Sequence, residues 1–198
     1  KIIHTYNFID DSIFKPLKIP KKKTSILFIG RLDEQKNLFN LFDALSNLKE
    51  FDLDIIGTGP LERVLKKKAN ALGINVNFLG IFQNNKMPEI INQYELFILP
   101  SLWEGNPKVL LEAMSCGLAC IGTNVRGIKN IINHKENGYL CERDVNSIKE
   151  AIKSVYDDNS LRNKMAFNAR EFILENCSLD SIVKKEYSLY NEVLKKKS

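Results

Sequence analysis

Two short segments of the chain carry charged residues at spacings that suit the binding of an anion. In the first, GRLDEQKN, a guanidinium and an ammonium lie five residues apart at Arg31 and Lys36. An arginine fork takes two oxygens and a lysine ammonium acts as a point charge, so the two side chains can converge on one dianionic group such as a pyrophosphate. The simpler alternative is a pair of solvated surface cations.

The second segment, residues 100–117, carries two glutamates eight positions apart, Glu104 and Glu112. Asn106 followed by Pro107 predicts an N-cap with proline at the first helical position, and Gly117 predicts the end of the same helix. The unpaired amides and the dipole at the start of a helix favour an anion. This segment therefore predicts a second group of donors for the same ligand.

Apolar residues cover most of this predicted helix and leave Glu112 on a narrow polar strip with Lys108 and Ser115. A carboxylate on a nearly buried helix must be paired or must serve a ligand. Either Glu112 pairs with Lys108, in the less favourable order along the helix, or it accepts hydrogen bonds from the sugar hydroxyls of a nucleotide. We expect the second. Glu104 is either a surface charge or faces the polar groups of a substrate.

Six short apolar runs, without polar alternation, are typical of strands buried on both faces. They cover residues 26–29, 53–56, 76–79, 96–99, 119–122 and 139–141. Stretches with helical spacing lie between them, and three helices are predicted after the last run, at about 145–157, 160–175 and 179–195.

This alternation predicts an α/β fold: a doubly wound, Rossmann-like parallel sheet of six strands in the order 3-2-1-4-5-6. In that order the first and fourth strands are neighbours, and a crevice opens at their carboxyl ends. The two charged segments follow these two strands. We therefore expect them to face each other across the crevice.

The amino-acid composition is that of a globular protein. The chain has 198 residues, of which 44% are hydrophobic and 27% charged, which fits one large domain or two small ones and excludes a disordered or collagen-like chain. The four cysteines form no CxxC pair and the two histidines have no cysteine at ligand spacing, so we expect buried thiols, a reducing compartment and no zinc site.

Charge, motifs and hydropathy argue against a nucleic-acid-binding, a dinucleotide-binding, a membrane-spanning and a secreted protein. The net charge of +5 is concentrated in lysine clusters at 21–23, 66–68 and 195–197, which indicate solvated turns and helix ends or a patch for an acidic membrane or polyanion. No nucleic-acid motif is present, and a single glycine in the first segment argues against a dinucleotide site. No run is long enough to span a membrane, and no secretory signal opens the chain. Because the sequence does not begin with Met, we expect it to be part of a longer chain.

The segments GRLDEQKN, IIGTGPL, NVNFLG and LPSLWEGNPKVLLEAMSCG occur in this order. Together they resemble the C-terminal nucleotide-sugar-binding domain of retaining GT-B glycosyltransferases, family 4, also called glycosyl transferases group 1. The resemblance covers about residues 1–195. It implies an interdomain hinge at 1–24, a donor-binding domain at 25–178, and a C-terminal helix at 179–198 that crosses back to an N-terminal domain absent from this chain.

The resemblance also implies roles for single residues. Arg31 and Lys36, beside Gly30, would hold the diphosphate of a UDP- or GDP-sugar, and Glu112 would bind the ribose. Glu104 would face the transferred sugar, so that Glu104, Arg31 and Lys36 form the catalytic set. The donor would further be contacted at Ile81 and Phe82 beside the base, and at Gly105, Asn106, Pro107, Val109 and Leu110 around phosphate and sugar. Asn106 departs from the Phe or Leu that is frequent in the family, so the sugar preference is not carried over.

The implied activity is retaining transfer of a hexose to a glycan or lipid-linked acceptor, in surface polysaccharide biosynthesis. The implied location is the cytoplasm, with peripheral contact at the inner face of the membrane left open. No metal cofactor is expected, and the acceptor would be bound mainly by the N-terminal domain, so that this chain alone is inactive. Two alternatives stay open: a non-catalytic nucleotide-sugar-binding module that acts as a scaffold, and a sugar-nucleotide epimerase or hydrolase on the same fold.

Overall fold

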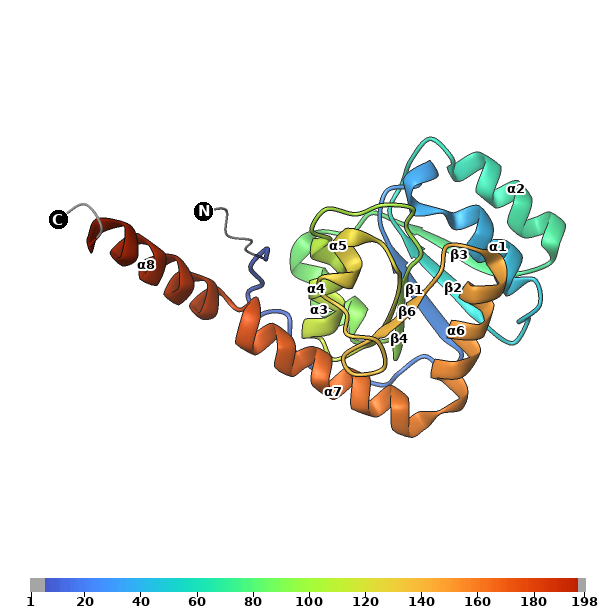
Figure 1. Ribbon diagram of the computed structural model, residues 1–198. Coiled ribbons are helices and arrows are strands. Elements are labelled where there is room, and N and C mark those ends of the chain that lie inside the picture. The colour runs from blue at the N-terminus through green and yellow to red at the C-terminus, as the bar shows by residue number, and fades with distance from the viewer. Residues whose placement is uncertain (1–5, 196–198) are drawn as a thin grey trace.

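A parallel sheet forms the centre of the molecule in the computed structural model, which describes residues 6–195 (Figure 1). Predictions for residues 1–5 and 196–198 lie outside the described residues. The strands are β1 Ser25–Ile29, β2 Asp52–Ile56, β3 Asn75–Gly80, β4 Leu96–Leu99, β5 Ala119–Thr123 and β6 Tyr139–Cys141. Their order is β3-β2-β1-β4-β5-β6, with every neighbouring pair parallel. The predicted fold and strand order are confirmed.

Helices cover both faces of this sheet. They are α1 Leu38–Leu45, α2 Glu62–Leu72, α3 Met87–Ile91, α4 Lys108–Ser115, α5 Arg126–Lys129, α6 Val145–Asp157, α7 Asn159–Asn176 and α8 Leu179–Lys195, with short 3-10 turns η1 Glu34–Lys36 and η2 Asn84–Lys86. Figure 1 shows α1, α2 and α6 on one side of the sheet, α3, α4 and α5 on the other, and α8 projecting from the body. None of the helices between residues 6 and 195 has the length and apolar character needed to cross a bilayer.

The two central strands are almost entirely buried because helices lie on both of their faces. In β4 all four residues are buried, and in β1 only the first residue is not. This is why the strands read as continuous apolar runs rather than alternating ones. The four cysteines are buried, as predicted, and burial raises the pKa of the Cys116 thiol to about 12.

The start of α4 differs from the prediction. Pro107 is the N-cap, with φ −72° and ψ 100°, and the helix begins at Lys108. The extended ψ keeps proline outside the first turn, although its carbonyl accepts from the Leu110 amide at 3.1 Å. Asn106 makes no capping bond, and its buried Oδ1 has no partner. The predicted end is confirmed, since Gly117 follows α4 with a φ of +73°.

The segment before β1, predicted as a hinge, packs onto the domain over its described part. Ile9 and Phe14 are buried in the main hydrophobic cluster. Lys22 Nζ donates to Asp54 Oδ2 at 2.6 Å and to the Tyr94 hydroxyl at 2.8 Å. The segment is therefore anchored both by burial and by a polar network.

Candidate functional site

The loops that follow β1, β2 and β3 are joined by main-chain hydrogen bonds at the carboxyl edge of the sheet. The Gly30 amide donates to Ile56 O at 2.9 Å, and the Gly57 amide donates to Gly80 O at 2.7 Å. Gly57 has a φ of +131°, and a Cβ there would lie 2.0 Å from Gly30 O. Only glycine allows these two loops to approach so closely.

The loop after β4 meets the loop after β1 from the other side. The Leu102 amide donates to Gln35 O at 2.7 Å, and Gln35 Nε2 donates to Trp103 O at 2.8 Å. Gly127 at the start of α5 supports this loop, since a Cβ there would lie 2.3 Å from Glu104 O. The two charged segments do meet across the crevice, as the strand order predicted.

Lys36 and Glu104 form a buried ion pair between these loops. Lys36 Nζ lies 2.5 Å from Glu104 Oε1, and the two side chains are 13% and 8% exposed. Ser101 Oγ donates to the same carboxylate oxygen at 2.7 Å. Glu104 is therefore not a surface charge, and Lys36 already has a partner.

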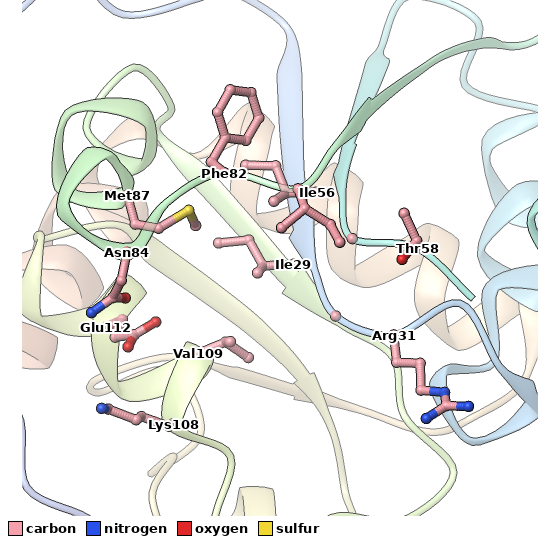
Figure 2. A pocket seen from close by; sticks show the side chains of 13 residues that line it. Ile29, Arg31, Ile56, Thr58, Phe82, Asn84, Met87, Lys108, Val109 and Glu112 are labelled. Atoms are coloured by element: carbon pink, nitrogen blue, oxygen red, sulfur yellow. The ribbon is translucent and has the colours of Figure 1, made fainter.

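Arg31 is in the opposite situation. Its side chain is 73% exposed, and its closest carboxylate is Asp33, with Arg31 Nε 3.6 Å from Asp33 Oδ2. The guanidinium stands at the margin of the crevice (Figure 2). Arg31 is thus available to a ligand without breaking a buried contact.

A crevice of about 560 Å³ opens over the carboxyl ends of β1 and β2, between the loop after β3 and the first turns of α4. This size suits a small-molecule ligand. It is lined by Ile29, Gly30, Arg31, Ile56, Gly57, Thr58, Ile81, Phe82, Asn84, Met87, Lys108, Val109 and Glu112 (Figure 2).

Six of the predicted site residues line this crevice, namely Gly30, Arg31, Ile81, Phe82, Val109 and Glu112. The other six are absent from its wall, namely Lys36, Glu104, Gly105, Asn106, Pro107 and Leu110. Leu110 is fully buried in the core. Lys36 and Glu104 lie beside the crevice, where they bind each other.

Several wall residues were missed by reasoning from the sequence. Ile29 and Ile56 are the last residues of β1 and β2, so the strand ends themselves could have indicated them. Asn84 and Met87 come from η2 and α3, whose approach to α4 is a matter of tertiary packing. The Lys108 side chain, which the sequence places beside Glu112 on the polar strip, also lines the wall.

Glu112 is buried, with 6% of its surface exposed, and it lines the crevice. No described residue donates a hydrogen bond to its carboxylate, and the alternative ion pair with Lys108 is not formed. Lys108 Nζ instead lies over the Phe8 ring, 5.9 Å from its centroid. Burial raises the pKa of Glu112 to about 7, against the opposing charge of Lys108. Figure 2 shows the carboxylate between Asn84 and Val109.

Between residues 6 and 195, no group of three or more His, Cys, Asp or Glu side chains is arranged to hold a metal ion. The crevice instead offers an exposed guanidinium, a buried unpaired carboxylate and an apolar wall. Such a set can bind a ligand that is anionic at one end and carries hydroxyl donors at the other.

The fold and the position of the crevice define a doubly wound α/β domain with its candidate site at the topological switch point, where open sheets of this type bind ligands. The family model for glycosyl transferases group 1 matches residues 9–172, and the chain belongs to this family.

Curated relatives agree with this assignment. The chain is 29% identical to N-acetyl-alpha-D-glucosaminyl L-malate synthase of Bacillus anthracis, over 96% of this chain and 53% of the relative. It is 33% identical to UDP-Gal:alpha-D-GlcNAc-diphosphoundecaprenol alpha-1,3-galactosyltransferase of Escherichia coli, over 87% of this chain and 47% of the relative. The chain thus spans about half the length of these relatives.

Solved structures share the fold. The C-terminal domain of the glycosyl transferase group 1 protein LpcC from Francisella tularensis superposes with a TM-score of 0.77 at 23% identity, covering 86% of this chain and 99% of that domain. Anabaena Alr3699/HepE, solved in complex with UDP, gives a TM-score of 0.85 at 19% identity, over 95% of this chain and 57% of that one.

Proposed function

We propose that this chain is the donor-binding domain of a glycosyltransferase and that its crevice takes the nucleoside diphosphate of a UDP- or GDP-sugar. The observation that carries the proposal is Glu112, a buried carboxylate in the crevice wall with no donor from the described protein. A buried carboxylate without partners is unfavourable. The adjacent hydroxyls of a ribose would supply two donors to it.

The diphosphate would lie toward the loop after β1. Arg31 offers a planar fork there, and Lys36 lies behind it, with its Cε 3.3 Å from where a Cβ of Gly30 would be. Pro107 has no amide hydrogen, and the Leu110 amide already donates to Pro107 O, so the free amides of the α4 start are those of Lys108 and Val109.

The base would lie against the loop after β3. Ile81 is 75% exposed and Phe82 is 38% exposed, and both line the crevice. Large apolar side chains left open to solvent at a crevice wall suit the face of a heterocyclic base.

The chemistry follows from charge. Breaking the bond between sugar and phosphate leaves negative charge on the diphosphate and positive character on the sugar ring. Arg31 and Lys36 would stabilise the leaving group more strongly in the transition state than in the ground state, and Glu104 would face the sugar. With two cations available, we propose that no metal ion is required.

The proposed reaction is retaining transfer of a hexose to a glycan or lipid-linked acceptor in surface polysaccharide biosynthesis, in the cytoplasm. It is supported by the names of relatives, such as the E. coli galactosyltransferase that uses UDP-Gal, and by the neighbouring structure with UDP. The acceptor would be bound mainly outside this chain, so we expect donor binding but no transfer from these 198 residues alone.

Calorimetry with UDP and with GDP tests the proposal directly. At least one should bind in the micromolar to submillimolar range, and with equal affinity in EDTA and in magnesium. Absence of binding by both at millimolar concentration would refute the proposal.

The ribose contact has its own test. If Glu112 accepts from the ribose, the chain binds UDP more tightly than 2′-deoxy-UDP or 3′-deoxy-UDP, and Glu112→Ala abolishes the preference. Glu175→Ala is the matched control, because Glu175 is an exposed glutamate on α7. A preference that survives Glu112→Ala would assign the ribose contact elsewhere.

A further inference from the structure

Two fully buried hydroxyl side chains lie behind the Lys36–Glu104 ion pair. Ser101 follows β4 and Thr123 ends β5, and neither has exposed surface. Thr123 Oγ1 donates to Ser101 O at 2.5 Å, and Ser101 Oγ donates to Glu104 Oε1 at 2.7 Å. A chain of two hydrogen bonds thus connects the end of β5 to the Glu104 carboxylate.

One carboxylate oxygen carries both contacts, because Glu104 Oε1 also accepts from Lys36 Nζ at 2.5 Å. The Glu104 side chain is only 8% exposed, so water cannot easily replace a lost donor. If Lys36 turned toward a diphosphate, Ser101 would be the remaining donor to that oxygen.

We propose that the Lys36–Glu104 ion pair exchanges when a diphosphate binds, and that Ser101 is the positioning residue that holds the Glu104 carboxylate in place during the exchange. Thr123 fixes the Ser101 main chain. The inference rests on the proposed function, since it takes a nucleoside diphosphate as the incoming anion. It assigns a role in the site to two residues that do not line the crevice.

A purely structural role for Ser101 makes a different prediction. If Ser101 only stabilised the loop after β4, its loss would weaken ligand binding regardless of the residue at position 104. If Ser101 acts through the Glu104 charge, its loss matters only while that charge is present. A double-mutant cycle separates the two cases.

The experiment measures the affinity of UDP and of GDP by calorimetry for the 198-residue chain, Ser101→Ala, Glu104→Gln and the double variant. Ser101→Ala should bind about tenfold more weakly, because the buried carboxylate loses its second donor in the complex. Glu104→Gln should bind more tightly, because Lys36 is released and a negative charge is removed. Within Glu104→Gln, adding Ser101→Ala should change the affinity by less than about twofold.

Thr123 gives a second, isosteric test. Thr123→Val keeps the shape and removes the donor, and should weaken binding about threefold. Thr123→Ser keeps the hydroxyl and should restore the affinity. Ser178→Ala is the matched control: Ser178 is a buried serine whose hydroxyl donates to Leu174 O at 2.9 Å, at the start of α8. It should change the melting temperature without changing the affinity.

The outcomes separate the two proposals. An equal loss from Ser101→Ala in both backgrounds, or no loss in the wild-type background, overturns the exchange and leaves nucleotide binding intact. Failure of the unmodified chain to bind either nucleotide overturns the proposed function and the exchange with it. If Ser101→Ala does not fold, by its melting curve, Thr123→Val takes its place in the cycle with Glu104→Gln.

Discussion

The loop after β1 supplies two cations and the segment after β4 supplies two glutamates, and these four residues form two pairs. The pairs differ in burial and in whether the charges bind each other. Lys36 and Glu104 are buried and bind each other at 2.5 Å. The Arg31 side chain is 73% exposed. Glu112 is 6% exposed, and no residue between 6 and 195 donates a hydrogen bond to its carboxylate. We call Lys36 and Glu104 the closed pair, because they bind each other, and Arg31 and Glu112 the open pair, because no ion pair joins them.

The difference shows how the loops around one crevice can be held together while the crevice keeps polar groups available for a ligand. An extra hydroxyl donor offsets part of the desolvation cost of a buried ion pair, and the Lys36–Glu104 pair joins two loops before any ligand arrives. Burial raises the pKa of the Glu112 carboxyl, and hydroxyl donors from a ligand would favour its ionised form. Before a ligand binds, the Lys36–Glu104 pair holds the two loops together, whereas Arg31 and Glu112 already line the crevice.

Breaking the closed pair on one side should have the largest effect. Lys36→Met leaves the Glu104 carboxylate buried with one donor, and we expect a loss of about 3 to 5 kcal/mol in the free energy of unfolding. Adding Glu104→Gln removes the unpaired charge and should recover most of the loss. Urea unfolding at pH 7 measures both.

The surface pair of Lys66 and Glu62 is the control for that experiment. Its atoms lie 2.6 Å apart, nearly the same distance, but the side chains are 52% and 32% exposed. Lys66→Met should change stability by less than about 1 kcal/mol. Equal losses from Lys36→Met and Lys66→Met would show that burial does not distinguish the pairs.

Glu112, the acidic member of the open pair, should make the free energy of unfolding depend on pH. Burial raises the pKa of Glu112 from 4.5 to about 7, so the folded chain holds this proton more tightly than the unfolded chain does. Its contribution to stability is therefore present below about pH 4.5 and is lost as pH rises through 7, a change of about 3 kcal/mol. Glu112→Gln stays neutral, and should be more stable than the wild type at pH 8 by about that amount and equal to it at pH 4.5.

Urea unfolding at both pH values checks this, with Glu175→Gln as the exposed counterpart. A stability difference between Glu112→Gln and wild type that does not vary with pH would mean that the carboxylate has a donor in solution. Added UDP should also narrow the difference, since ribose donors favour the ionised form.

The glycine that supports the closed pair should matter next. A Cβ at Gly127 would lie 2.3 Å from Glu104 O, a main-chain atom, whereas a Cβ at Gly105 would meet nothing within 4 Å. We expect Gly127→Ala to lower the free energy of unfolding by about 1 to 3 kcal/mol and Gly105→Ala to change it little. Thermal unfolding of the two variants decides the point, and equal effects would show that the loop yields freely.

The smallest effect on stability is expected at the exposed member of the open pair. Arg31→Met should alter the free energy of unfolding by no more than about 0.5 kcal/mol. It should nevertheless weaken UDP or GDP binding about tenfold, because a charged donor to the diphosphate is lost. Calorimetry gives the affinity, and an unchanged value would remove Arg31 from the proposed site.

The central strands could be predicted from the sequence because strands buried on both faces are apolar throughout, and the strand order followed from the order that six alternating strands and helices usually adopt. The edge strand β3 differs from the prediction, since none of its residues is buried. The runs at 96–99 and 139–141 match β4 and β6 residue for residue. Because the charged segments follow the first and fourth strands, which are neighbours in this order, the topology also predicted that the two segments meet. The start of α4 did not follow, because an extended Pro107 is a local conformation that the Asn-Pro pair permits but does not require.

Amino-acid order by itself determined the layered α/β architecture, the edge of the sheet that bears the site and the presence of Glu112 on a mostly apolar helix. The tertiary structure determined which charged side chains form ion pairs with each other. Lys36 and Glu104 are 68 positions apart in the chain and Ser101 and Thr123 are 22 apart, so their contacts depend on how the loops close over the sheet. Periodicity reports the burial of an element, whereas the pairing of side chains from different elements is set by packing distances of a few ångströms.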